Sequence, residues 1–315
     1  MAIICVSQNV IAAKMQPLPY PVEQQLSVEI VLTQQEWQVD VQDSSAVASQ
    51  FGLIGALVGL AADSAAKKNA EQRIAAVRKL MEGYNFNEKF EAAAREAIAT
   101  PGISPGADIK IVRSAWQQSV DINKPRPAQE LRVFIVTPRY SVTQNFEQIS
   151  ITLDVKYVAR VLKPNGSIGQ SIIFSRIYRF NIPMDTISGS QATDDANRWV
   201  ALGKEQLTVL ANQSIKQVTD MLAFDFSTEG RALSVQSTQG LKVNFKGKVY
   251  KGRVLRQTED YIWIQSGKDW TQTIQGYQPI SGEPVSIPVE PAATEQVSDV
   301  LSDDTKTTQV IEENK

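Results

Sequence analysis

Hydrophobic and polar residues alternate most regularly between positions 149 and 162, in the run ISITLDVKYVARVL. Every odd position from 149 to 161 is apolar, and polar residues such as Ser150, Asp154 and Arg160 lie between them. This period of two predicts a half-buried strand about 45 Å long. An Asn-Gly turn in KPNGS and a second β-type run at 171–183 predict its partner in an unusually long antiparallel hairpin.

The remainder of the first 228 residues alternates between strand-like and helix-like patterns. Further strands are predicted at 26–42, 109–122 and 131–143. Helices are predicted at 65–80 with a stop at Gly83, from Asn85 or Asn87 to about Ala99, and at 196–222 after Thr193, Asp194 or Asp195. We therefore expect an α+β domain over 14–228, in which helices cover one face of an antiparallel sheet.

The chain after STEGR (227–231) changes character, because four short strand-like runs follow one another with turns between them. This spacing predicts a small SH3-like or OB-like β-barrel domain at 229–282. From Ser281 onward no hydrophobic period remains, and Pro, Glu, Thr and Ser dominate. We expect a disordered acidic tail at 283–315.

The segment FGLIGALVGLAADSAAKK, at 51–68, is apolar and carries Gly52, Gly55 and Gly59. Its apolar core is shorter than the ~20 residues that a membrane span requires. Gly55 and Gly59 have the GxxxG spacing that lets two helix backbones approach closely. We interpret the segment as a glycine-rich connection into a buried helix. A peripheral or oligomeric membrane contact through 46–62 is the second interpretation, and a true span the third.

Composition excludes several kinds of chemistry, because the chain has no histidine and its single cysteine is Cys5. A Ser-His-Asp triad, a Cys-His pair and a histidine base are therefore excluded, and a zinc site is not expected. No disulfide can form within the chain. The sequence predicts no catalytic, metal-binding or cofactor-binding residues, and no cofactor.

Two short motifs resemble known chemistry. Ser64 and Lys67 have the SxxK spacing of the penicillin-binding and β-lactamase serine enzymes, but the SDN-type and KTG-type motifs of those enzymes are absent. The pattern is short enough to arise by coincidence, so a serine hydrolase is only a minor alternative. Asp194 and Asp195 have the residue type of a cation site, but a helix cap requires the same residues.

Basic and aromatic residues interleave in the predicted barrel. The bases are Lys242, Lys246, Lys248, Lys251, Arg253 and Arg256, and the aromatics are Phe245, Tyr250, Tyr261, Trp263 and Trp270. This mixture suits a platform for single-stranded nucleic acid, with rings for stacking and charges for phosphate. Small barrels also use aromatics as core and lysines on edge strands. We take Tyr250, Trp263 and Trp270 as candidate partner contacts, with nucleic acid as the less favoured partner.

The overall charge does not favour a dedicated nucleic-acid binder. The net charge is −2, and residues from Ser281 to the end contribute eight acidic residues and two lysines. The remaining chain is therefore only mildly basic. At the other end, the first thirteen residues, MAIICVSQNVIAA, resemble the back half of a secretory signal, with Val10 to Ala12 before the cleavage point. Segment 1–13 is thus interpreted as a truncated signal peptide, with an N-terminal strand or leader as the alternative.

The order of strand, glycine-rich segment, helices, β-meander and the run RWVALGKEQLTVLANQSIKQVTDMLAFDF resembles uncharacterised Gram-negative envelope proteins, often lipoproteins, over about 26–226. The residues before Cys5 depart from a lipoprotein cleavage box. The resemblance implies a non-enzymatic assembly role in the periplasm or at the outer membrane, with other envelope proteins or a second copy as partners. It carries no site residues. A cytosolic nucleic-acid-binding protein is the alternative.

Overall fold

The computed structural model describes residues 26–40, 64–114, 132–162, 168–185, 187, 189, 191–234, 240–266 and 273–280. All of them belong to one compact unit that extends to Glu283. The predicted signal peptide, the glycine-rich segment and the acidic tail lie outside the described residues, as do Trp270 and the KPNGS turn.

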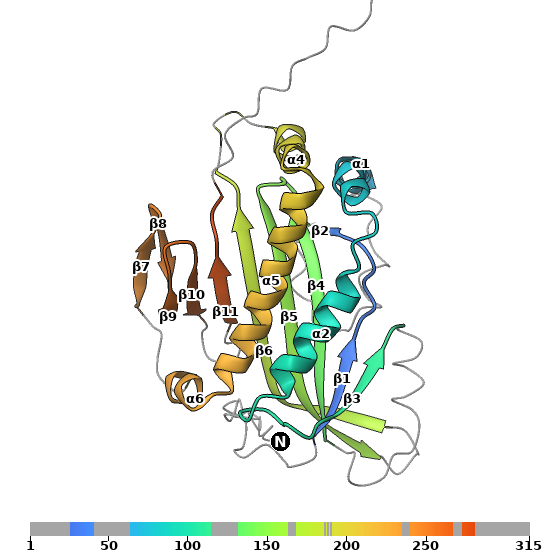
Figure 1. The fold of residues 1–315 in the computed structure, drawn as a ribbon, viewed down its shortest axis with the longest axis vertical. Helices are drawn as coiled ribbons and strands as arrows, with labels where there is room; N and C mark the ends of the chain where they lie inside the picture. The colour runs from blue at the N-terminus through green and yellow to red at the C-terminus, as the bar shows by residue number, and fades with distance from the viewer. Residues whose placement is uncertain are drawn as a thin grey trace, which may run out of the picture. The chain divides into compact units, whose positions relative to one another are not determined.

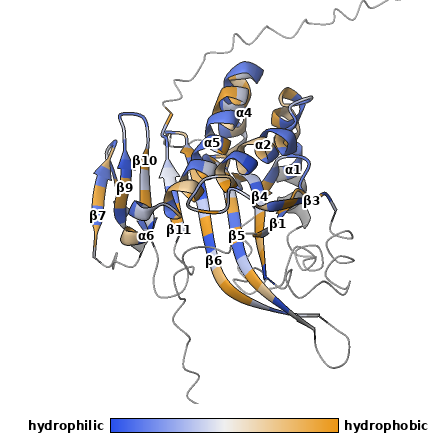
Figure 2. Cartoon of the chain, turned by 60° about the horizontal axis from the view of Figure 1, so that its bottom comes forward, coloured by the Kyte–Doolittle hydropathy of each residue, from blue (hydrophilic) through white to orange (hydrophobic). Residues whose placement is uncertain are grey.

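Three long antiparallel strands form the centre of a large sheet (Figure 1). They are β4 (Arg132–Thr143), β5 (Gln148–Leu162) and β6 (Ile168–Pro183). The β5–β6 pairing runs from Gln148 opposite Pro183 to Leu162 opposite Ile168. Figure 2 shows hydrophobic and hydrophilic residues alternating along these strands, as the sequence pattern predicts.

Short parallel strands extend the sheet beyond β4. β1 (Ser27–Val31) lies between β3 (Asp108–Val112) and β4, and β2 (Gln38–Asp40) pairs with β4 further along. The predicted strand at 109–122 is thus described only at its beginning. The sheet is therefore mixed, with an antiparallel centre and parallel additions, whereas the sequence pattern led us to expect antiparallel pairing throughout.

The strands after residue 240 do not form the expected separate barrel in the part of the chain that is described. β9 (Arg253–Gln257), β10 (Ile262–Ser266) and β11 (Thr273–Tyr277) continue the main sheet, because β11 pairs parallel with β6. β7 (Lys242–Phe245) and β8 (Lys248–Lys251) form a two-stranded ribbon of their own. No closed barrel is found among these strands, since the free edge of β6 accepts β11.

Helices cover one face of the sheet, so the predicted α+β class is confirmed (Figures 1 and 2). They are α1 (Ser64–Leu80), α2 (Phe86–Ile98), α4 (Ala192–Ala201), α5 (Gly203–Asp225) and α6 (Thr228–Ser234). α5 packs on β5 and β6, and α2 packs beside α5. The core between them includes Ile151, Leu153, Trp199, Val218 and Met221.

Two helical predictions need correction. The single helix expected at 196–222 is interrupted, because Gly203 has a φ of +73° and separates α4 from α5. The left-handed conformation ends one helix and starts the next at little cost only because the residue is glycine. The STEGR segment (227–231), where a second domain was expected to begin, instead contributes to α6, and the Gly230 N–H donates to Ser227 Oγ at the start of this helix.

The polar face of β5 is also more buried than a half-buried strand would be. Ser150 is buried and donates to Asn181 Oδ1 at 2.9 Å. Arg160 is 2% exposed and binds Glu29 of β1 through two hydrogen bonds of 2.9 and 2.7 Å. A bidentate ion pair of this kind satisfies both charges away from water. The alternation therefore predicted the strand but not the burial of its second face.

Along the described part of the chain, no helix is both long enough and apolar enough to cross a membrane. Segment 46–62, for which membrane contact was considered, lies outside that part.

Candidate functional site: a polar pocket at the start of α2

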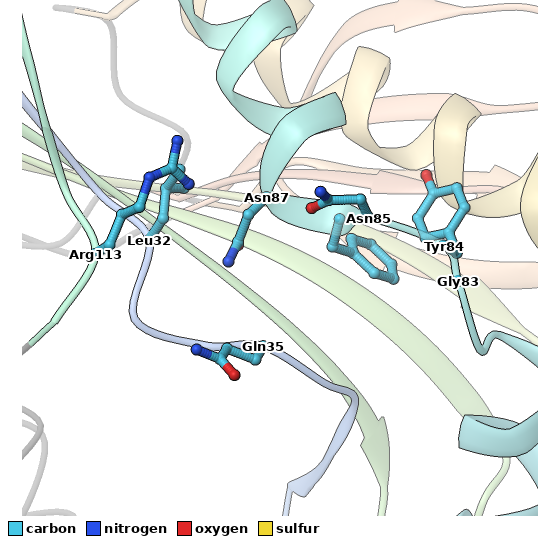
Figure 3. A pocket seen from close by; sticks show the side chains of 8 residues that line it. Leu32, Gln35, Gly83, Tyr84, Asn85, Asn87 and Arg113 are labelled. Carbon is cyan, nitrogen blue, oxygen red and sulfur yellow. The ribbon is translucent and has the colours of Figure 1, made fainter.

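A pocket of about 460 Å³ lies where the β1–β2 connection, the α1–α2 connection and the end of β3 meet (Figure 3). The described residues that line it are Leu32, Gln35, Gly83, Tyr84, Asn85, Phe86, Asn87 and Arg113. Most of these side chains are amides or aromatics, and carboxylates are absent from this set. The pocket thus offers hydrogen-bonding groups together with the apolar side chains of Leu32 and Phe86.

Phe86, which lines the pocket, belongs to a cluster of packed aromatic rings. The ring of Phe86 lies parallel to that of Tyr140 on β4, with centroids 4.0 Å apart. Trp37 meets both rings edge-on, and Tyr84 meets Phe86 edge-on at 4.7 Å. Such contacts are worth about 0.5–1.5 kcal/mol per pair beyond burial. The start of α2 is therefore held firmly against the sheet.

Gln34 fixes the β1–β2 connection that forms one wall. Its Nε2 donates to the Tyr140 carbonyl at 2.6 Å, and its Oε1 accepts from the Tyr140 N–H at 3.3 Å. The Tyr140 hydroxyl in turn donates to the Gln34 carbonyl at 2.6 Å. The Gln34 side chain thereby satisfies the backbone of a neighbouring strand, and the next residue, Gln35, is left exposed at the pocket.

Two asparagines at the start of α2 have different roles. Asn85 caps the helix, because its Oδ1 accepts from the Glu88 N–H at 3.1 Å and its Nδ2 donates to Glu88 Oε2 at 3.2 Å. Asn87 has a shielded Oδ1 to which no hydrogen bond is made among the described residues. Figure 3 shows its side chain pointing from α2 toward the side on which Gln35 lies. The shielded oxygen is closed to a ligand, whereas the amide nitrogen at the tip of the side chain is a donor on the side of Gln35.

The charged and ionisable groups of the pocket, Arg113 and Tyr84, form hydrogen bonds with neighbouring side chains, and these bonds limit their use in proton transfer. Arg113 donates from Nη2 to Glu91 Oε2 at 2.7 Å, and Glu91 also accepts from Arg95. The Tyr84 hydroxyl donates to Asn212 Oδ1 at 2.7 Å. Burial raises the pKa of Tyr84 to about 12, so its proton stays in place near neutral pH. The described lining is suited to binding rather than to acid–base chemistry.

The structure separates the candidate residues singled out in the sequence. Trp263 is 0% exposed, and its Nε1 donates to Gln217 Oε1 of α5 at 2.7 Å. Arg256 lies 4.2 Å from the centre of the Trp263 ring. Trp263 is therefore a core residue and is not accessible to a partner. Tyr250 is half-buried, with its ring 4.3 Å from that of Tyr277.

The other candidate residues lie at the start of a helix or among the residues that the structure does not describe. Gly52, Gly55, Gly59 and Trp270 lie outside the described residues. Ser64 is the first residue of α1, and Lys67 follows one turn later, but their side chains are not described.

The aspartate pair that had the residue type of a cation site belongs to the start of α4. Asp194 Oδ2 accepts from the Gln191 N–H at 3.0 Å, and Asp195 binds Arg198 at 3.0 Å. The helix therefore starts earlier than expected, because Gln191 is the N-cap residue; Asp194 takes part in the cap from the first turn, whereas Asp195 forms an ion pair within the helix.

Sequence patterns did not identify the pocket, because its walls come from three connections far apart in the chain. The one available signal was the Asn85-Phe86-Asn87 run, in which both asparagines had the residue type of a helix cap.

Within the described residues, no group of three or more His, Cys, Asp or Glu side chains is arranged to hold a metal ion. Comparison with protein-family models, with curated proteins and with solved structures finds no match to this chain.

Proposed function

We propose that the protein is a non-catalytic structural and interaction protein of the Gram-negative envelope. It acts in the periplasm or at the outer membrane as part of an assembly. The signal-like pattern of the first thirteen residues and the resemblance over about 26–226 support this location. The observation that carries the interaction role is the amide-rich pocket at the start of α2, whose described lining suits binding.

The pocket suits a polar, uncharged group of a partner, such as a backbone amide or a hydroxyl. The Asn87 amide nitrogen donates to an acceptor of the partner, and the exposed amide of Gln35 both donates and accepts. Arg113 is bound to Glu91, so its charge is already balanced. An anionic ligand would have to compete with that carboxylate, which favours a neutral one.

Export is tested by fractionating cells that express the protein from its native upstream region and by reading the mature N-terminal peptide by mass spectrometry. A chain that begins near Ala13 or Lys14 in the envelope fraction supports the proposal. An intact Met1 in the soluble cytosolic fraction contradicts it.

The pocket is tested by placing a photo-crosslinking amino acid at Gln35 and irradiating living cells. We expect a discrete adduct with a partner protein at Gln35. Gln72, an exposed glutamine on α1, is the matched control and should give none. Asn87→Leu in the protein that carries the crosslinker at position 35 should weaken the adduct, because the amide donor of Asn87 is lost. Equal labelling at Gln35 and Gln72, or none at either, would argue against a partner site here.

A further inference from the structure

The ribbon of β7 and β8, with the strand that follows it, is strongly cationic. The run KVNFKGKVYKGRVLR, at 242–256, has lysine or arginine at six positions and no acidic residue, although the whole chain has a net charge of −2. The six are Lys242, Lys246, Lys248, Lys251, Arg253 and Arg256. Figure 1 shows the ribbon beside β9 and β10, apart from helices α1 and α2.

The strand register divides the ribbon into an inner and an outer face. Val243 lies opposite Tyr250, and both pack with Phe245 against Ile262 and Ile264 of β10. The alternate positions, Lys242 opposite Lys251 and Asn244 opposite Val249, therefore lie on the outer face. All four of these outer residues are exposed.

The outer face lowers the stability of the protein in water, because it holds like charges side by side and exposes an apolar side chain. Like charges directly opposite one another in adjacent strands repel, and no described residue forms an ion pair with Lys242 or Lys251. Val249 lies two residues from Lys251 on the same face, with 65% of its surface exposed, the largest fraction among the large hydrophobic side chains of the described residues. Both costs fall if an anionic surface with an apolar layer beneath it covers this face.

We propose that the outer face of the β7–β8 ribbon binds the surface of an anionic phospholipid bilayer. Lys242 and Lys251 meet headgroup phosphates, Lys246 in the turn between the strands adds to the attraction, and Val249 enters the interfacial layer. This contact is independent of the pocket at the start of α2 and adds a second kind of partner to the proposed function.

Three observations favour a bilayer over other polyanions. Among the described rings that would stack on nucleic-acid bases, Phe245 is 5% exposed, Trp263 is 0% exposed, and Tyr250 and Tyr261 are half-buried. Lysines are compact point charges that suit a diffuse anionic surface, whereas a specific phosphate or carboxylate site more often uses the planar fork of arginine. The single exposed valine among the lysines adds apolar contact that a soluble polyanion would not use.

The test is co-sedimentation of the full chain with vesicles of phosphatidylcholine alone or of phosphatidylcholine mixed with phosphatidylglycerol. We expect binding only to the mixed vesicles, weakening as salt is raised. Lys242→Gln with Lys251→Gln should lower the partition coefficient roughly 30-fold, as expected for two lysines near an anionic surface. Val249→Thr, which keeps a β-branched residue, should lower it by a smaller factor.

The matched control is Lys79→Gln with Lys89→Gln, which removes the same charge from exposed positions on α1 and α2. It should leave vesicle binding unchanged. Equal binding to both kinds of vesicle, or an equal loss in the two double variants, overturns the proposal. It is also overturned if single-stranded DNA or polyglutamate binds in a manner that depends on Lys242 and Lys251 while anionic vesicles do not.

Discussion

At the scale of single residues, Asn85 connects the pocket to the stability of α2. Its side chain satisfies the Glu88 N–H and holds the Glu88 carboxylate, so the first turn of the helix depends on it. Asn85→Ala should lower the free energy of unfolding by about 1 kcal/mol, measured by urea denaturation. Asn85→Ser, which keeps a capping oxygen, should lose clearly less. An equal loss in both variants would show that capping is not the cause.

Asp225, at the end of α5, is a second residue with a measurable effect. Its Oδ2 accepts from the Tyr178 hydroxyl at 2.8 Å and lies 3.4 Å from Arg176 Nε. Burial raises the pKa of Asp225 above its ordinary value of 3.8, although Arg176 and the Tyr178 hydrogen bond oppose the shift. Burial likewise raises the pKa of Tyr178 well above 10.0. The folded protein therefore holds the Asp225 proton more tightly than the unfolded chain.

The pH dependence follows from that difference in proton binding. Protonated Asp225 stabilises the folded protein fully below pH 3.8, the ordinary pKa of the group. This contribution falls as the pH rises through the higher pKa of the folded state. Asp225→Asn cannot titrate, so the unfolding free energy of the wild type minus that of the variant should fall over this window and then level off. Urea denaturation at a series of pH values measures it. A difference that is constant or rises with pH would contradict the assignment.

Residue patterns predicted some of these roles and missed others for a physical reason. Asn85 or Asn87 was predicted as the cap, and the structure assigns that role to Asn85; such a prediction is possible because capping depends on neighbours within one turn. Trp263 was predicted as a contact residue, but it lies in the core because α5 provides Gln217 as its hydrogen-bond partner. That partner is 46 positions away in sequence. Local alternation in β10 cannot show which face such a distant helix covers.

At the scale of elements, the junction of β11 with β6 depends on Gly276. A side chain there would clash with Phe180 of β6 and Met221 of α5. Gly276→Ala should lower the free energy of unfolding by about 1–3 kcal/mol, since the strand, its neighbour and the helix cannot all keep their positions. Thr273→Ala, in the same strand but partly exposed, is the control and should have a small effect. A tolerated Gly276→Ala would mean that this junction is loosely packed.

The elements themselves were largely predictable, whereas their pairing was not. The helices at 65–80 and after Asn85, and the strands at 131–143 and 149–162, follow from periodicity within each segment. The parallel addition of β11 to β6 depends on an open edge and on contacts between segments some ninety residues apart, which alternation does not encode. The break at Gly203 leaves the hydrophobic stripe intact, so periodicity gave no sign of it.

At the scale of the whole molecule, the continuous sheet predicts one cooperative unit. β10 and β11 should unfold together with β5 and β6, because they share a sheet and the core beneath α5. Native-state hydrogen exchange read by mass spectrometry should give the slowest amides of β10 the same opening free energy as those of β5. A clearly lower value for β10 would instead support an independent C-terminal domain.

The pairing of β6 with β11 has a consequence for biosynthesis, because β11 is synthesised long after β6. β6 ends at Pro183 and its partner β11 begins at Thr273, so about ninety residues separate them. At about 5–20 residues per second, a ribosome needs roughly 5–20 s to supply the missing strand. During that interval the nascent chain presents a long unpaired β-edge, which is prone to aggregation. Production of this protein should therefore depend on chaperones that shield nascent chains.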